Sequence, residues 1–194
     1  MITGRKNDAV DIMEKALQAD PLSPIVNKSL ADVYLNARRA DDALKQVELM
    51  LGIYPPMLVA LELKGWCVGV KGDWKKAAEI FEEDRRLMNM HPLKGLSSLG
   101  CAYANSGETE KALECIRKIE QTQLEEPGVI LDADLAMIWL SLGDKDKAFH
   151  HLFQCVNKRM GPVAIIIEHP MFKVPRDDPR YRLLKEKRNL VEYD

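Results

Sequence analysis

The chain has 194 residues, 46% hydrophobic and 30% charged, so it can bury a core and is not a disordered tail. Its 28 basic and 30 acidic residues give a net charge of −2, which argues against direct binding of nucleic acid through a basic surface. The longest strongly apolar run, residues 163–167, is far shorter than the roughly 20 residues that span a bilayer.

Cysteine usage predicts a reducing compartment. Cys67, Cys101, Cys115 and Cys155 form no Cys-x-x-Cys pair, and the first eight residues contain no apolar segment of a signal peptide. We therefore expect a cytoplasmic protein whose thiols are free and buried as small apolar groups. Disulfide bridges are the alternative, and they would require secretion.

Five alanines reveal an internal repeat. Ala9, Ala43, Ala77, Ala112 and Ala148 are 34, 34, 35 and 36 residues apart. Four residues after each alanine stands an apolar side chain, in chain order Met13, Val47, Phe81, Ile116 and Leu152. Apolar residues at such intervals form a stripe on one helix face, and a small residue lets two helices approach closely.

A turn signal stands five residues before each later alanine: Arg38, Gly72, Gly107 and Gly143. Glycine can adopt positive φ and end the preceding helix, and Asp144 can cap the helix that follows Gly143. Each repeat is therefore predicted to be a helical hairpin. Because one hairpin cannot bury its own apolar face, successive hairpins are predicted to stack.

The repeat resembles the tetratricopeptide repeat (TPR) family, whose pattern is W-x2-L-G-x2-Y, A-x3-F and P. The fourth unit matches at Leu99, Gly100, Tyr103, Gly107, Ala112 and Ile116, and the fifth at Leu135, Ala136, Trp139, Gly143, Ala148 and Leu152. The second unit matches at Asn27, Leu30, Ala31, Tyr34, Ala43, Val47 and Pro55. The third departs from the pattern, with Lys64 in the usual Leu position. The resemblance implies an all-α fold, a right-handed superhelix (solenoid) of helical hairpins with a C-terminal cap.

The predicted organisation is a repeat domain over residues 1–160 and a cap over 161–194. The repeat domain comprises a half repeat at 5–21 and units at about 24–55, 57–90, 93–122 and 129–159. Helices are predicted at about 6–19, 24–37, 40–53, 57–70, 73–89, 93–105, 108–121, 129–142 and 144–159. Ala9, Met13, Ala16 and Pro21 match only the second helix of a repeat. We therefore expect a piece of a longer protein; the alternative is a first helix that caps the stack by itself.

The pattern changes after Lys158. Gly161 and Pro162 break the helix, an apolar run follows, and a last amphipathic helix is predicted through Leu183, Leu184 and Leu190. The segment resembles the tail of TPR segments in bacterial adenylate cyclases and winged-helix regulators, which reads His-Pro-x-Phe and then Arg-x-Asp-Pro-Arg-aromatic. We expect Met171, Phe172, Tyr181 and Leu184 to cover the last hairpin.

Candidate chemistry is sparse. His151 and Cys155 have a spacing that could place two zinc ligands on one face, but no second pair completes a site, so a core cysteine and a surface histidine are preferred. Glu82, Glu83 and Asp84 diverge around a helix and are read as a solvated face. Without a phosphate loop or a catalytic motif, we expect no enzyme activity, no metal and no cofactor.

The TPR resemblance implies a partner-binding groove along the first helix of each hairpin. The residues that line it are Lys28, Asp32, Asn36, Val59, Glu62, Trp66, Lys94, Ser97, Cys101, Asn105, Ile130, Ala133, Met137 and Ser141. A clamp for a terminal carboxylate is rejected, since only Lys28 fits it and Asp32 would repel the ligand. This mixture of polar and apolar side chains suits an apolar segment of a partner. For Trp66, packing between hairpins is the alternative.

We therefore expect a protein–protein interaction scaffold or sensory module, the C-terminal part of a larger bacterial regulator, with a protein or peptide partner and neither membrane nor direct nucleic-acid contact. Two alternatives stay open: a self-association module, with the chain as a homodimer, and the TPR part of a DNA-binding transcriptional regulator.

Overall fold

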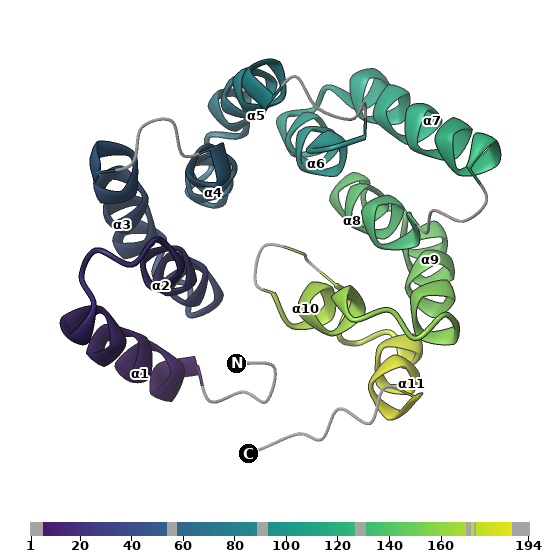
Figure 1. Cartoon of the computed structure of the whole chain (residues 1–194). Helices are drawn as coiled ribbons and strands as arrows, with labels where there is room; N and C mark the ends of the chain where they lie inside the picture. Colours follow the sequence, from purple (N-terminus) through teal and green to yellow (C-terminus); the bar gives the residue numbers. More distant parts are fainter. Residues whose placement is uncertain are drawn as a thin grey trace. The chain divides into compact units, whose positions relative to one another are not determined.

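The part of the chain that the structure describes is built from eleven helices and contains no β-strand (Figure 1). The structure is a computed structural model, and it describes residues 6–53, 58–88, 93–126, 131–169, 172 and 174–187. In chain order the helices are α1 (Lys6–Ala19), α2 (Pro24–Asn36), α3 (Ala40–Ile53), α4 (Leu58–Val70), α5 (Trp74–Met88), α6 (Leu96–Ser106), α7 (Thr109–Glu125), α8 (Asp132–Leu142), α9 (Lys145–Asn157), α10 (Pro162–Glu168) and α11 (Pro179–Lys187). The predicted all-α fold is confirmed.

The helices pair as hairpins within two compact units. The first unit, within residues 6–88, holds α1 and the hairpins α2–α3 and α4–α5; the second, within 93–187, holds α6–α7, α8–α9, α10 and α11. The two helices of each hairpin pack together, and α3 and α6 also pack on the next first helix, α4 and α8. The repeat pattern does not predict a boundary between α5 and α6, and the boundary predicted at residues 160 and 161 stays a prediction.

The alanine position is fully buried in each hairpin. Ala43, Ala77, Ala112 and Ala148 are all 0% exposed. The apolar residues that follow them by four, from Val47 to Leu152, are at most 3% exposed. The repeat register read from the sequence is therefore confirmed in the four hairpins, whereas Ala9 on α1 is only half-buried.

The turns inside the hairpins adopt the backbone that the sequence predicts. Gly72, Gly107 and Gly143 have φ of +107°, +86° and +81°, and Arg38 takes the same left-handed region at +64°. Asp144 caps α9, because its side chain accepts a hydrogen bond of 3.1 Å from the backbone N–H of Lys147.

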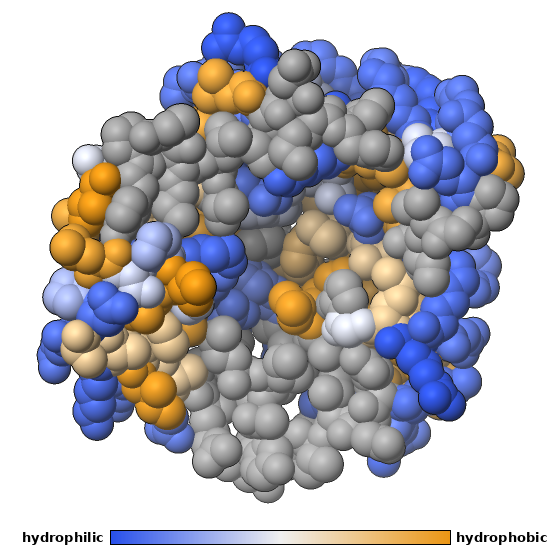
Figure 2. All heavy atoms as spheres, viewed as in Figure 1, coloured by the Kyte–Doolittle hydropathy of each residue, from blue (hydrophilic) through white to orange (hydrophobic). Residues whose placement is uncertain are grey.

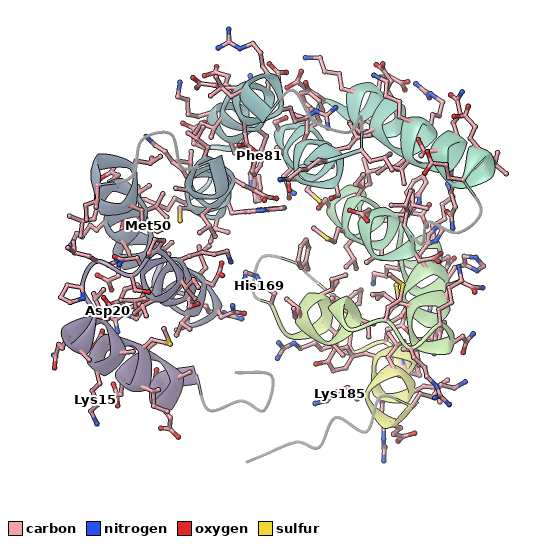
Figure 3. All side chains as sticks on the ribbon, in the orientation of Figure 1. Lys15, Asp20, Met50, Phe81, His169 and Lys185 are labelled. Atoms are coloured by element: carbon pink, nitrogen blue, oxygen red, sulfur yellow. The ribbon has the colours of Figure 1, made fainter. Side chains whose placement is uncertain are left out.

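Glycines allow close side-chain contacts between the helices, as Gly65 and Gly100 show. A Cβ on Gly65 of α4 would lie 2.4 Å from the ring of Phe81, and one on Gly100 of α6 would lie 2.6 Å from Cδ1 of Ile138. Figure 3 shows Phe81 between α5 and α4. Helix α4 is thus rotated as the repeat requires, although Lys64 stands where the family usually has leucine.

Helix boundaries follow the prediction within three residues except at the end of α7. Helix α6 begins at Leu96 rather than residue 93, because Gly95 has φ of +70° and cannot belong to an α-helix. Helix α7 continues to Glu125 rather than residue 121, and the side-chain hydrogen bond from Gln121 to Glu125 supports its last turn.

The tail packs on the last hairpin. Helix α10 contacts α8 and α9, and α11 contacts α9. Phe172, Tyr181 and Leu184 are buried as expected, and the apolar run from residue 163 forms α10, with Val163 fully buried. Met171 and Leu190 lie outside the described residues.

Arg180 connects helix α11 with helix α9. Its Nη1 lies 2.8 Å from Asp146 Oδ1, its Nη2 lies 2.8 Å from Asp178 Oδ2, and its guanidinium carbon lies 4.5 Å from the centre of the Phe149 ring. The side chain therefore joins the first turn of α11 to α9.

All four cysteines are free and buried, as predicted. Burial raises the pKa of the thiols of Cys67, Cys101 and Cys155 to about 12, so these side chains are poor nucleophiles. Among the described helices, none is both long and apolar enough to cross a membrane.

Candidate functional site

The side chains predicted to line the groove differ widely in exposure. Lys94 is exposed, and the half-buried members are Lys28, Asp32, Asn36, Glu62, Asn105, Met137 and Ser141. The buried members are Trp66, Ser97, Cys101 and Ala133. The side chain of Val59 and the whole of Ile130 lie outside the described residues. The groove positions therefore do not form one open stripe within either unit.

Trp66 belongs to the core of its own hairpin. Its ring centre lies 5.2 Å from that of Phe81 and 6.3 Å from that of Trp74, both edge to face, and the residue is 8% exposed. Aromatic pairs of this geometry are mutually stabilising. For Trp66 the structure thus favours packing over an open partner surface.

Three further groove positions are buried in the second unit, where α6 packs on α8. Ser97 bonds the carboxylate of Asp134, a half-buried residue that the groove prediction does not include. Cys101 is 0% exposed and interacts with the side chain of Ser141, and Ala133 is 7% exposed. These side chains join neighbouring hairpins and leave little surface for a partner.

In the first unit, the accessible groove residues follow one face of α2. The ammonium of Lys28 lies 2.5 Å from Oδ2 of Asp32, and Asn36 donates a hydrogen bond of 2.8 Å to the backbone carbonyl of Asp32. The charge of Lys28 is thus paired within its own helix. Ile25 extends the face and is 77% exposed; the repeat register could have found it, since it occupies the same position as Lys94.

The second unit contains a pocket at the C-terminal ends of α6 and α8. Its volume is about 240 Å³, below the roughly 300–1,000 Å³ of small-molecule sites, so it suits one side chain or a short stretch of peptide. The residues that line it are Asn105, Leu140, Ser141, Leu142, Gly143, Lys145 and Pro175. Asn105 and Ser141 are predicted groove residues, whereas no repeat register could place Pro175, which follows α10.

The pocket offers polar groups of several kinds. Asn105 donates one amide hydrogen to the carbonyl of Cys101 at 2.8 Å, which leaves its side-chain oxygen able to accept a further bond. The hydroxyl of Ser141 bonds the carbonyl of Met137 at 3.0 Å and can also accept. Lys145 is exposed, and its charge contributes to the lowered pKa of the Asp178 carboxyl. Peptide N–H groups and an acidic side chain are the complementary partners.

His151 is not the surface histidine that the sequence suggested. Its side chain is 16% exposed, and its Nδ1 lies 3.0 Å from Oδ1 of Asp132, whose Oδ2 lies 2.6 Å from Nζ of Lys158. Cys155 is fully buried. The described residues contain no cluster of three metal-ligating side chains.

The acidic run on α5 is only partly solvated. Glu82 and Glu83 are exposed as predicted, but Asp84 is 6% exposed and faces the interior of the unit. The three carboxylates therefore point in different directions and do not converge on one substrate.

Comparison with known proteins identifies the repeat. The model of the tetratricopeptide repeat family matches residues 93–121, the α6–α7 hairpin. A comparison with curated protein sequences gave no match.

Solved structures match most of the chain. A thermophilic TPR protein from Thermus thermophilus is 19% identical and has a TM-score of 0.62, over 97% of this chain and 92% of that one. Nearly identical TPR-like repeats named for a Podosopora anserina kinesin light chain are 20% identical, with a TM-score of 0.55 over 80% and 90%. MamA is 20% identical, with a TM-score of 0.50 over 80% and 90%. Residues 93–121 are thus a tetratricopeptide repeat, and the fold of the chain is that of tetratricopeptide-repeat proteins.

Proposed function

We propose that the chain is a protein–protein interaction module that binds a peptide of a partner protein at the α6–α8 pocket. The observation that carries the proposal is the meeting of Asn105 and Ser141 in one pocket. Each stands seven residues before the alanine of its hairpin, so equivalent positions of consecutive repeats contribute to the same site. A site built from two repeats can follow an extended segment along the stack.

The chemistry of the pocket favours an extended peptide with an acidic side chain. The amide of Asn105 and the hydroxyl of Ser141 can bond peptide N–H and C=O groups, which every sequence offers. Leu140, Leu142 and Pro175 supply apolar contact. Lys145 adds selectivity, because an acidic group on the peptide would meet its exposed ammonium at the edge of the pocket.

Selection from a displayed peptide library tests the proposal. We expect enriched peptides to carry an acidic residue and to bind the wild-type chain in fluorescence anisotropy. The double variant Asn105→Leu with Lys145→Glu should weaken binding by at least about tenfold, because it removes hydrogen bonds and reverses a charge.

Glu110→Ala on the exposed face of α7 is the matched control and should leave the affinity unchanged. Circular dichroism of each variant separates lost binding from lost folding. Equal binding of the enriched peptides to the wild type and the double variant would overturn the assignment of the pocket.

We further propose that the module serves as the C-terminal part of a larger bacterial regulator. The support is the tail, where His169, Phe172 and residues 178–181 follow the order found in TPR segments of adenylate cyclases and winged-helix regulators. The coding sequence upstream of residue 1 tests this context. Light scattering over a concentration series tests the alternative of self-association, which predicts a mass that rises with concentration.

A further inference from the structure

Helix α8 has one accessible side, and a carboxylate stands on it. Four of its eleven residues are half-buried: Asp134, Met137, Ser141 and Leu142. The other seven are buried, namely Asp132, Ala133, Leu135, Ala136, Ile138, Trp139 and Leu140. Because Asp134, Met137 and Ser141 follow one another at intervals of three and four residues, they share one side of the helix, which we call the α8 face.

The α8 face continues from the α6–α8 pocket. Ser141 belongs to both, since it also lines the pocket with Asn105 and Lys145. Helix α6 packs beside α8, and its residues from Leu96 to Tyr103 are buried. A peptide that leaves the pocket toward the N-terminal end of α8 therefore passes Met137 and then reaches Asp134.

The charge of Asp134 has no cationic partner among the described residues. The ion pairs of α8 in that part of the chain belong to Asp132, which binds His151 and Lys158. Burial raises the pKa of the Asp134 carboxyl, and the hydrogen bond from Ser97 offsets only part of this effect. An ionised carboxylate that is half-buried, costs stability and stands on an accessible face is typical of a binding position.

We propose that Asp134 binds a basic side chain, Lys or Arg, of the same peptide whose acidic residue meets Lys145 at the α6–α8 pocket. The inference rests on the proposed function of that pocket and adds a second contact to it. The peptide is extended, with one charge at each end of the contact and its middle on the thioether of Met137, a side chain that adapts to different neighbours. Complementary charges at both ends select this partner among other peptides.

The helix also sets the spacing of the two charges on the peptide. Asp134 and Ser141 are seven residues apart on α8, which corresponds to about 10.5 Å along the helix axis. An extended peptide advances about 3.3 Å per residue, so about three residues span the same distance. We therefore expect a basic residue three positions from the acidic one, in the order that the direction of the bound peptide requires.

Peptides enriched from the displayed library on the wild-type chain are the probes. We expect the most enriched peptide to carry the two charges at this spacing. Replacing its basic residue by Gln should weaken binding to the wild type about fivefold in fluorescence anisotropy. Asp134→Asn should weaken binding of the original peptide equally and should bind the two peptides with the same affinity, because each change removes one partner of the same ion pair.

Glu120→Gln is the matched control, since it also replaces a carboxylate by an amide. Glu120 is exposed on α7, and Figure 2 shows a mainly hydrophilic surface over that helix. This variant should keep the fivefold difference between the two peptides. Urea unfolding of Asp134→Asn at the pH of the binding assay separates lost binding from lost folding, since a variant at least as stable as the wild type binds less through its missing charge.

Two results would overturn the role of Asp134 and leave the pocket in place. One is a set of enriched peptides that depend on Asn105 and Lys145 but carry no basic residue at the expected spacing and bind Asp134→Asn as tightly as the wild type. The other is an equal loss in the wild type and in Asp134→Asn when the basic residue is replaced, which would put that residue elsewhere. If the double variant of Asn105 and Lys145 binds the enriched peptides like the wild type, the proposed function fails, and this inference fails with it.

Discussion

Asp132 and Asp134 stand two residues apart on α8, yet their carboxyl pKa values shift in opposite directions. Burial opposes ionisation of Asp132, but the ammonium of Lys158 and the ring of His151 outweigh it and lower the pKa. Burial also dominates at Asp134, and there the hydrogen bond from Ser97 is too weak to offset it, so the pKa is raised. Partners on α9 and at its C-cap, rather than depth alone, therefore decide which carboxylate is held ionised.

Asp132→Asn should destabilise the protein at pH 7 by about 1–3 kcal/mol, because it removes charge-assisted hydrogen bonds from a buried site. The pKa is lowered in the folded state, so the stabilisation is complete above the usual pKa of about 4 and is lost as the pH falls through the lowered value. Urea unfolding at pH 7 and pH 3 should show the difference from wild type shrinking in acid. A difference that is the same at both values would exclude the ionised carboxylate as its source.

Asp134→Asn should act in the opposite sense. A raised pKa in the folded state means that ionisation destabilises the fold, and this cost appears as the pH rises through the raised value. The amide keeps an acceptor for Ser97 without the charge, so the variant should unfold at a higher urea concentration than wild type at pH 7 but not at pH 3. A loss of stability at pH 7 would show that the ionised carboxylate has a favourable partner.

Gly65→Ala should lower the free energy of unfolding by about 1–3 kcal/mol, because the new Cβ would overlap the ring of the buried Phe81. Gly52→Ala is the matched control, since Gly52 is helical and has no atom within 4 Å of the added Cβ. This control should stabilise by about 0.5–1 kcal/mol through helix propensity. Equal effects of the two substitutions in thermal unfolding would mean that α4 is rotated away from Phe81.

Sequence predicts the hairpins well because local chemistry specifies them. Three features depend only on neighbours close in the chain: the alanine spacing, the left-handed residue at Arg38 or Gly143, and the cap at Asp144. Each is found as expected. The repeat register also indicates which helix face is apolar. Local signals were therefore sufficient for nine helices to be placed within a few residues.

The accessible site could not be read in the same way. Whether Cys101 lines a groove or is buried depends on how far α8 closes over α6, and that contact involves residues about forty apart. Pro175 reaches the pocket from the irregular segment after α10, which follows no repeat. The partner of His151 is Asp132 on the preceding helix, a pair that becomes apparent only once the hairpins are aligned.

Ala112→Leu should destabilise by about 1–3 kcal/mol, since Ala112 is 0% exposed and a larger side chain must push α6 and α7 apart. For a chain of this length the thermal midpoint should fall by about 2–4 °C per kcal/mol. Glu110→Leu, two residues earlier on the exposed face of α7, is the control and should change the midpoint little. A midpoint unchanged by Ala112→Leu would show that the repeat register of this hairpin is wrong.

Truncation after Lys158 tests the role of the tail. Val163, Ile167 and Leu184 are at most 1% exposed, and their burial against α8 and α9 removes apolar surface of both partners from water. Each 100 Å² of such surface contributes about 2.5 kcal/mol, an amount that matters against a total stability of about 5–15 kcal/mol. The truncated protein should melt at a lower temperature than the full chain and should bind the hydrophobic dye ANS or self-associate.

Arg180→Ala tests the polar contacts of the tail separately from its buried apolar contacts. The substitution removes the ion pairs with Asp146 and Asp178 and the contact with the ring of Phe149 but keeps the apolar residues of α10 in place. Asp146 is exposed, so its ion pair adds little, and Asp178 lies only two residues from Arg180 in the same segment. The variant should therefore lose less stability than the truncation and should not bind ANS. If the truncated chain stays monomeric and melts like the full chain, the tail contributes no stability to the last hairpin, and its apolar residues become candidates for a separate partner site.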